Sequence, residues 1–177
     1  MILLNFFTFI ILVILFFYRK PKLFIQRNNY DKVYSPAHGT IINIKEDTTH
    51  IFIAIFLSPL DIHYQFYPVS GKVTSIVYDN TGKYELAYNI NKSKDNEKCI
   101  HTIINSNGEF KVYQIAGYFV RRISYYDKPN TNVTSGDILG LIHFGSRVDV
   151  LIPKHNFKLL VKEKEKVNNK TLLGYFN

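Results

Sequence analysis

The chain has 177 residues, enough for one domain with a sizeable core. Its formal net charge is +8, but the Lys and Arg residues are scattered and no recognition-helix or RNA-binding motif occurs, which argues against a nucleic-acid partner and favours an anionic membrane. The single cysteine excludes an internal disulfide, the histidines show no metal-ligand spacing, and both observations agree with a metal-free protein in a reducing compartment.

Residues 2–18 form an apolar run that is interrupted only by Asn5 and Thr8. As a helix of about 1.5 Å per residue, this run spans roughly 26 Å, near the short limit for a hydrocarbon core of about 30 Å. No charge precedes the run and bulky residues end it, which is typical of a retained anchor and not of a cleaved signal peptide. A buried core helix is the alternative. The basic residues of the linker 19–32 favour a membrane-anchored protein whose following domain lies in the cytoplasm.

The remaining residues, 33–177, contain short runs rich in Ile, Val, Tyr and Phe, separated by clusters of Gly, Asn, Asp and Pro, as in strands joined by turns. We expect strands at 39–44, 50–57, 71–78, 101–104, 110–116, 138–143 and 147–152. Residues 89–97 are expected to form a polar loop, and 118–126 either start as a helix or continue as a strand. The predicted fold is mainly β, a compact antiparallel sandwich or barrel-like domain that follows an N-terminal anchor helix at 1–18.

Six short motifs follow one another in this domain, and each alone would be weak. They are SPAHG at 35–39, FLSPLDIH at 56–63, PVSG at 68–71, NEK at 96–98, QIAGYFVRRI at 114–123 and FGSRVD at 144–149. In this order they resemble the short forms of the phosphatidylserine decarboxylase family. The resemblance implies a carboxy-lyase that converts phosphatidylserine to phosphatidylethanolamine.

The pair Gly145-Ser146 is central to this resemblance. Such a pair between two strands is usually only a turn, but glycine leaves its carbonyl open to attack and serine offers an adjacent nucleophile. A hydrolase nucleophile elbow has glycine on both sides of the serine, whereas Arg147 follows here. The resemblance implies that Ser146 attacks the Gly145 carbonyl. The chain then splits into a β chain of residues 1–145 and an α chain of residues 146–177, and the Ser146 remnant becomes a pyruvoyl cofactor.

Two histidines receive roles from the same resemblance. His63 is the implied proton carrier of decarboxylation, a task that suits imidazole because its pKa lies near neutrality; the structural alternative is a histidine that caps a turn. Asp61 is expected to accept backbone hydrogen bonds in that turn. His38 stands where the family has an aspartate that takes part in self-cleavage, and an imidazole supplies no fixed negative charge. Phe66 replaces the second histidine of the longer bacterial-type forms.

Three arginines are candidate ligands of the substrate phosphate or carboxylate, because guanidinium presents a planar donor fork to either group. They are Arg121, Arg122 and Arg147. Consecutive strand residues point to opposite faces, so at most one of the first two is expected to face the site.

The sequence thus leads to a pyruvoyl-dependent phosphatidylserine decarboxylase at an anionic membrane. The alternative is an unprocessed, inactive homologue that binds anionic phospholipid, and an unrelated membrane-tethered interaction domain is the third interpretation. The oligomeric state stays open, a homo-oligomer included.

Overall fold

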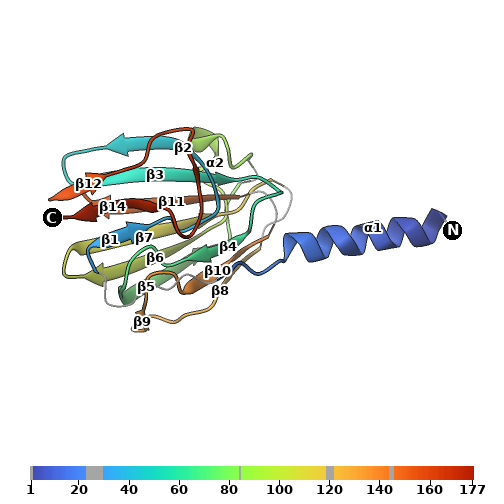
Figure 1. The fold of residues 1–177 in the computed structure, drawn as a ribbon, viewed down its shortest axis with the longest axis horizontal. Coiled ribbons are helices and arrows are strands. Elements are labelled where there is room, and N and C mark those ends of the chain that lie inside the picture. Colours follow the sequence, from blue (N-terminus) through green and yellow to red (C-terminus); the bar gives the residue numbers. More distant parts are fainter. Residues whose placement is uncertain (1, 23–29, 84, 119–121, 144–145) are drawn as a thin grey trace.

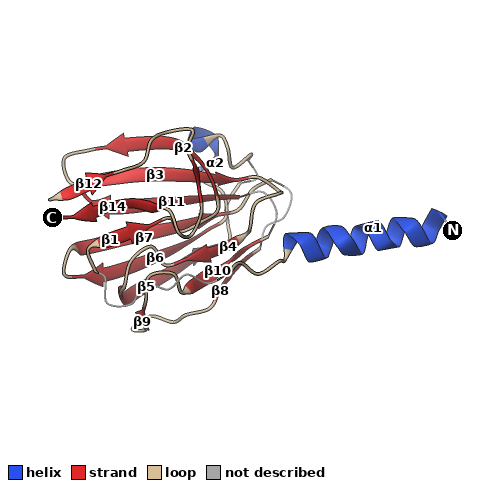
Figure 2. Ribbon diagram, in the orientation of Figure 1, coloured by secondary structure: helices blue, strands red, loops and turns tan. Residues whose placement is uncertain are grey.

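A computed structural model gives the structure of residues 2–22, 30–83, 85–118, 122–143 and 146–177. A helix, α1, extends away from a body of β-strands, on the side opposite the C-terminus (Figure 1). Colouring by secondary structure shows that strands dominate this body (Figure 2). The predicted mainly β fold with an N-terminal helix is therefore confirmed.

The described strands are short, and apart from one isolated bridge they pair antiparallel. The strands are β1 (Lys32–Tyr34), β2 (Gly39–Glu46), β3 (His50–Leu57), β4 (Tyr64–Phe66), β5 (Gly71–Asp79), β6 (Lys98–Asn105), β7 (Gly108–Ile115), β8 (Ile123–Tyr125), β9 (Asn132–Val133), β10 (Ile138–Ile142), β11 (Ser146–Pro153), β12 (Phe157–Leu159), β13 (Lys166–Val167) and β14 (Leu172–Phe176); the helices are α1 (Ile2–Phe17) and α2 (Ile90–Ser93).

Among the described residues, the largest sheet has eight strands in the order β13, β2, β3, β11, β7, β6, β5, β9. Two smaller sheets have the orders β1, β14, β12 and β4, β10, β8. The β4–β10–β8 sheet lies at the end of the body from which α1 extends (Figure 1). The motifs that carry the candidate catalytic residues lie near this end, where the small sheet meets the large one.

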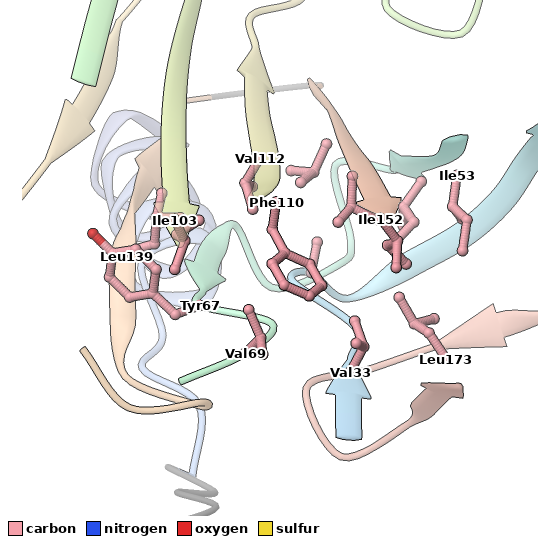
Figure 3. Packing of buried hydrophobic residues seen from close by; sticks show 14 of the residues in the cluster. Val33, Ile53, Tyr67, Val69, Ile103, Phe110, Val112, Leu139, Ile152 and Leu173 are labelled. Carbon is pink, nitrogen blue, oxygen red and sulfur yellow. The ribbon is translucent and has the colours of Figure 1, made fainter. Parts of the chain in front are cut away.

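One core joins the three sheets. Figure 3 shows Phe110 from the large sheet among side chains that include Leu139 of β10 and Leu173 of β14. All three residues are fully buried, and the Phe110 ring meets the Phe176 ring edge-on with centroids 5.8 Å apart. The sheets cannot separate without exposing this apolar surface to water, which stabilises their arrangement.

The structure contains all seven expected strands, with ends displaced by up to three residues. Strands β1, β4, β9, β12, β13 and β14 were not predicted, because each is too short to show clearly the alternation of a half-buried strand. The expected loop at 89–97 contains the one-turn helix α2, which Asn89 caps by accepting a hydrogen bond from the Lys92 amide at 3.2 Å. Within 118–126, residues 119–121 lie outside the described residues and Ile123–Tyr125 form strand β8.

Helix α1 carries large exposed apolar side chains between Phe6 and Phe16, including Phe9, Leu12 and Leu15. In the described part of the chain, no helix is both long enough and apolar enough to cross a membrane. The end of the expected anchor at 1–18 makes contact with the strands. Phe17 is only 2% exposed, and Tyr18 packs against the buried cluster of Tyr64, Phe66 and Leu141.

Two truncations test this boundary. Deleting residues 1–15 should leave a folded, β-rich domain in far-UV circular dichroism, since the described side chains of that segment are exposed. Deleting residues 1–18 also removes buried Phe17, so its urea unfolding free energy should be lower by about 2 kcal/mol. A disordered spectrum for the shorter deletion would place the helix inside the fold, and equal stability of both truncations would exclude a packing role for Phe17.

Candidate active site

The motif strand β11 begins at the end of the large sheet that adjoins the small one. Ser146 is the first residue of β11 and lies opposite Leu57, the last residue of β3. The chain leaves Leu57 through a turn and reaches His63, whose carbonyl accepts a hydrogen bond from the Ile142 amide at 3.3 Å. Because Ile142 is four residues before Ser146, this pairing brings His63 and Ser146 to the same end of the body. Gly145 and Phe144 lie outside the described residues.

Ser146 is fully buried, and within the described residues its hydroxyl has no hydrogen-bond partner. A buried hydroxyl normally finds a partner, because losing water without replacement costs about 1–3 kcal/mol. An unpaired Oγ at the first residue of a central strand is therefore a candidate nucleophile.

His63 is fully buried, and its ring nitrogens have different surroundings. Nδ1 lies 2.9 Å from the Asp61 carbonyl oxygen, which can only accept, so Nδ1 carries the proton. Nε2 is then the basic nitrogen, and it is buried without a partner in the described structure. Burial lowers the pKa of His63 to about 4; the Asp61 contacts oppose this shift, while Arg19 and His143 add to it. His63 is thus a neutral imidazole with an available lone pair.

Asp61 has the structural role expected of it. Its Oδ2 accepts hydrogen bonds from the Ser58 amide and the Ser58 hydroxyl, both at 2.8 Å. The Asp61 amide in turn donates to the Ser58 carbonyl at 2.9 Å. These contacts fix the turn that carries His63, which confirms the prediction that Asp61 serves the turn.

His38 immediately precedes β2 and lies one strand further from the motif. Thr40 of β2 pairs with Phe56 of β3, and Phe56 pairs with Arg147 of β11. Since β3 lies between, the His38 and Ser146 backbones are two strand spacings apart, roughly 10 Å. Burial lowers the pKa of His38, and Nε2 is buried without a partner in the described structure. A proton transfer between His38 and Ser146 therefore needs an intervening group or a movement of the loop.

A cavity of about 250 Å³ adjoins His38. Its lining includes His38 and Ile62, and also Lys22 and Lys170. A side-chain hydrogen bond with Asn169 and the charge of Asp61 partly oppose the lowering of the His38 pKa by burial. The cavity thus combines a neutral histidine with two positive side chains.

The three arginines have different environments. Arg147 is 2% exposed; its Nε donates to Asp149 at 2.8 Å, and its Nη1 donates to the Ala87 carbonyl at 3.1 Å and to the Ser93 hydroxyl. Arg147 therefore ties β11 to the segment around α2. Arg122 is exposed and lies near His143, whose pKa is lowered first by burial and then by the positive charge of Arg122. Arg121 lies outside the described residues.

A chain of buried polar side chains supports His63 from inside the body, and no motif of the sequence predicted it. Gln65 donates to the His63 carbonyl at 2.5 Å, Gln114 donates to Gln65 at 2.8 Å, and His101 Nε2 lies 3.0 Å from the Gln114 amide oxygen. These four side chains are fully buried. The available signal was a glutamine within the apolar strand β4 and another within the QIAG motif. Among the described residues, no group of His, Cys, Asp or Glu gathers as a metal site requires.

The buried pair of Arg147 and Asp149 gives a stability prediction. Asp149→Asn leaves the guanidinium without a countercharge, so the unfolding free energy should fall by about 3–5 kcal/mol in urea titrations. The double variant Arg147→Met/Asp149→Leu should recover most of this loss, because neither partner is then left charged in the core. If Asp149→Asn lowered the unfolding free energy by no more than the surface variant Asp95→Asn does, the pair of Arg147 and Asp149 would be solvated.

Comparisons with known proteins identify the family of the chain. The family described as phosphatidylserine decarboxylase matches residues 10–174. A provisionally named archaetidylserine decarboxylase proenzyme of Methanosarcina mazei is 37% identical over 88% of this chain and 71% of its own length. Phosphatidylserine decarboxylase proenzymes of Amoebophilus asiaticus and Cytophaga hutchinsonii are each 35% identical, over 90% and 94% of this chain and 73% and 79% of their own lengths. No solved structure matches significantly. The chain therefore belongs to the phosphatidylserine decarboxylase family, a family of carboxy-lyases.

Proposed function

We propose that this chain cleaves itself between Gly145 and Ser146 and then decarboxylates a phosphoserine lipid. The observation that carries the proposal is the unpaired, fully buried Ser146 hydroxyl at the same end of the body as the buried, neutral His63. Relatives named as decarboxylase proenzymes support both the reaction and a processing step. Their names differ in the lipid but share the serine headgroup, so the headgroup is the part that we assign to this site.

The cleavage starts from the Ser146 hydroxyl. Its Oγ bonds to the Gly145 carbonyl carbon, the peptide C–N bond breaks, and the chain is then joined by an ester with a free amine on residue 146. Elimination breaks the Ser146 Cβ–Oγ bond and leaves Gly145 with a free carboxylate. Hydrolysis of the unsaturated remnant takes up one water and releases ammonia. Residue 146 then carries a ketone in place of its amine.

The surroundings of Ser146 fit such a pyruvoyl group, since its side chain is enclosed and needs no displaced partner among the described residues. When formed, the group withdraws electrons from the serine carbon of the substrate as carbon dioxide leaves. His63 begins neutral, so its Nε2 first accepts a proton, for which the substrate ammonium is a source. His63 can then return that proton to the carbon that lost the carboxylate. The anionic substrate favours the protonated form of His63 during this transfer.

The substrate phosphate needs a positive partner at the edge of the site. We assign this task to Arg122, which is exposed beside His143, and to Lys22 and Lys170 in the cavity next to His38. Arg147 is not retained as a phosphate ligand, because Asp149, Ala87 and Ser93 already engage its guanidinium in the interior. Arg121 remains a sequence prediction.

We further propose that α1 holds this site at an anionic membrane with the catalytic domain in the cytoplasm. The exposed apolar side chains of the helix and the basic residues that follow it support this placement. An unprocessed lipid-binding homologue would use the same surface. Only His38, in place of the family aspartate, favours that second function.

Mass spectrometry of the purified chain separates the two functions. The wild type should give fragments of residues 1–145 and 146–177, the second lighter than a serine-started peptide by one ammonia. Ser146→Ala should stay whole. If His38 serves as the base, cleavage should slow only below pH 6.5, because burial lowers the pKa of His38 from that value.

The variant His38→Asp restores the family residue and provides the second arm of this experiment. A wild type that stays whole while His38→Asp cleaves would identify this chain as an unprocessed homologue. A wild type and His38→Asp that both stay whole at every pH would sink the self-cleavage proposal.

A separate prediction concerns turnover. His63→Ala should leave cleavage intact and lower decarboxylation by about 10² to 10⁴, the usual contribution of a positioned acid or base. His155→Ala is the matched control, because His155 is exposed beyond the other end of β11. Headgroup decarboxylation is measured as carbon dioxide release from phosphatidylserine in mixed micelles. Full activity of the cleaved His63→Ala protein would remove His63 from the mechanism.

A further inference from the structure

The last residue of α1 points into the body and covers the candidate catalytic histidine. Phe17 is 2% exposed, whereas its neighbour Phe16 is 48% exposed. The Phe17 ring lies 4.1 Å from the His63 ring between centroids, at an interplanar angle of 36°. An apolar ring therefore closes one face of His63 to water.

The next residue, Tyr18, connects the helix to the segment that precedes the cleavage motif. Its hydroxyl lies 2.8 Å from His143 Nδ1, and the Ser124 hydroxyl lies 3.3 Å from His143 Nε2. Both ring nitrogens of His143 are thus held, and His143 is only two residues before Gly145. The Tyr18 ring also meets the Phe17 ring edge-on, with centroids 5.1 Å apart. These contacts fix the chain on the N-terminal side of the motif.

Arg19 makes the third connection. Its Nη1 donates to the Phe16 carbonyl at 2.7 Å, and its Nη2 donates to the Leu60 carbonyl at 2.6 Å. A cation at this position complements the free carbonyls of a helix C-terminus. Because Leu60 lies in the turn that carries His63, Arg19 joins the helix end to that turn.

We propose that Phe17, Tyr18 and Arg19 form a cap on the active site, so that the end of the apolar helix is a working part of the site and not only a tether. The inference rests on the proposed role of His63. Phe17 excludes water from His63, Tyr18 positions His143 beside the motif, and Arg19 positions the His63 turn. These are positioning residues, since each acts through another side chain or a backbone group. A lipid held along α1 would then meet the site at the base of the helix.

The cap explains the state of His63. Burial is the largest cause of its low pKa, and Phe17 supplies part of that burial. The charged and titratable groups near His63 are Asp61 on its own turn, Arg19 after α1 and His143 after β10. Removing the Phe17 ring admits water but leaves these groups in place. The pKa of His63 should therefore move from about 4 toward 6.5 when the ring is removed.

The test uses the full chain in detergent micelles with Ser146→Ala, so that it stays one polypeptide. Proton NMR should show nuclear Overhauser contacts between the Phe17 and His63 rings, whose centroids are 4.1 Å apart. Histidine signals are then titrated in this background and with Phe17→Ala added, and His63 is identified by the signal that His63→Gln removes. Phe9→Ala is the matched control, being the same change on the same helix at a residue 64% exposed.

We expect the pKa of His63 to be higher by at least one unit in Phe17→Ala, which is about tenfold in proton affinity, and to be unchanged in Phe9→Ala. In the cleaved enzyme, the acidic limb of the turnover profile should move by the same amount. An unchanged His63 titration in folded Phe17→Ala would overturn the cap. Missing ring contacts between Phe17 and His63 would overturn it as well, even if Phe17→Ala does not fold. The NMR titration and the ring contacts do not need activity, so a failure of the proposed decarboxylation would be seen separately.

Discussion

The antiparallel pairing of β3 with β11 is the constraint on which the rest of the site depends. The two strands run in register from Ser146 opposite Leu57 to Pro153 opposite His50, without a shift. Both have neighbours on either side, so their backbone groups are paired and most of their side chains are buried. A one-residue slip would move every side chain of β11 to the other face. The register thus decides that Ser146 faces its enclosed position.

The buried polar groups of the site are of two kinds. Some are hydrogen-bonded to one another, and others have atoms without a partner in the described structure. The Gln65–Gln114–His101 chain supports the His63 carbonyl through hydrogen bonds. His63 Nε2 and Ser146 Oγ have no partner in the described structure, and neither has His101 Nδ1. A buried polar atom without a partner lowers stability and calls for an explanation. The proposed chemistry supplies that explanation for Ser146 and His63.

The neutral state of His63 also relates stability to pH. The unfolded chain binds a proton at histidine near pH 6.5, whereas the folded chain binds it only near pH 4. The unfolded state therefore holds more protons within this window, so this residue makes the fold less stable as the pH falls from about 6.5 to about 4. The low pKa of His63 thus lowers the stability of the fold in acid, and it leaves Nε2 unprotonated at neutral pH.

Several features of this protein follow from local sequence alone. The Ile/Val-rich runs predicted the long strands because alternation and turn residues are local properties, and the ordered motifs were enough to indicate the family. The roles of Ser146 and His63 are what that family resemblance implies. Asp61 could be assigned to its turn from local sequence as well, since its partner Ser58 is three residues away.

Only the tertiary structure decided which of the remaining candidates meet. Arg147 was a candidate phosphate ligand because of its guanidinium, but the fold buries it against Asp149 and the α2 segment. Tyr18 and His143 are 125 residues apart, and no periodic pattern relates them. Contacts of this kind depend on the packing of helix end, turn and sheet around a shared core, which has no local signature. The sequence therefore determined the long strands and the family, and the packing decided what surrounds Ser146 and His63.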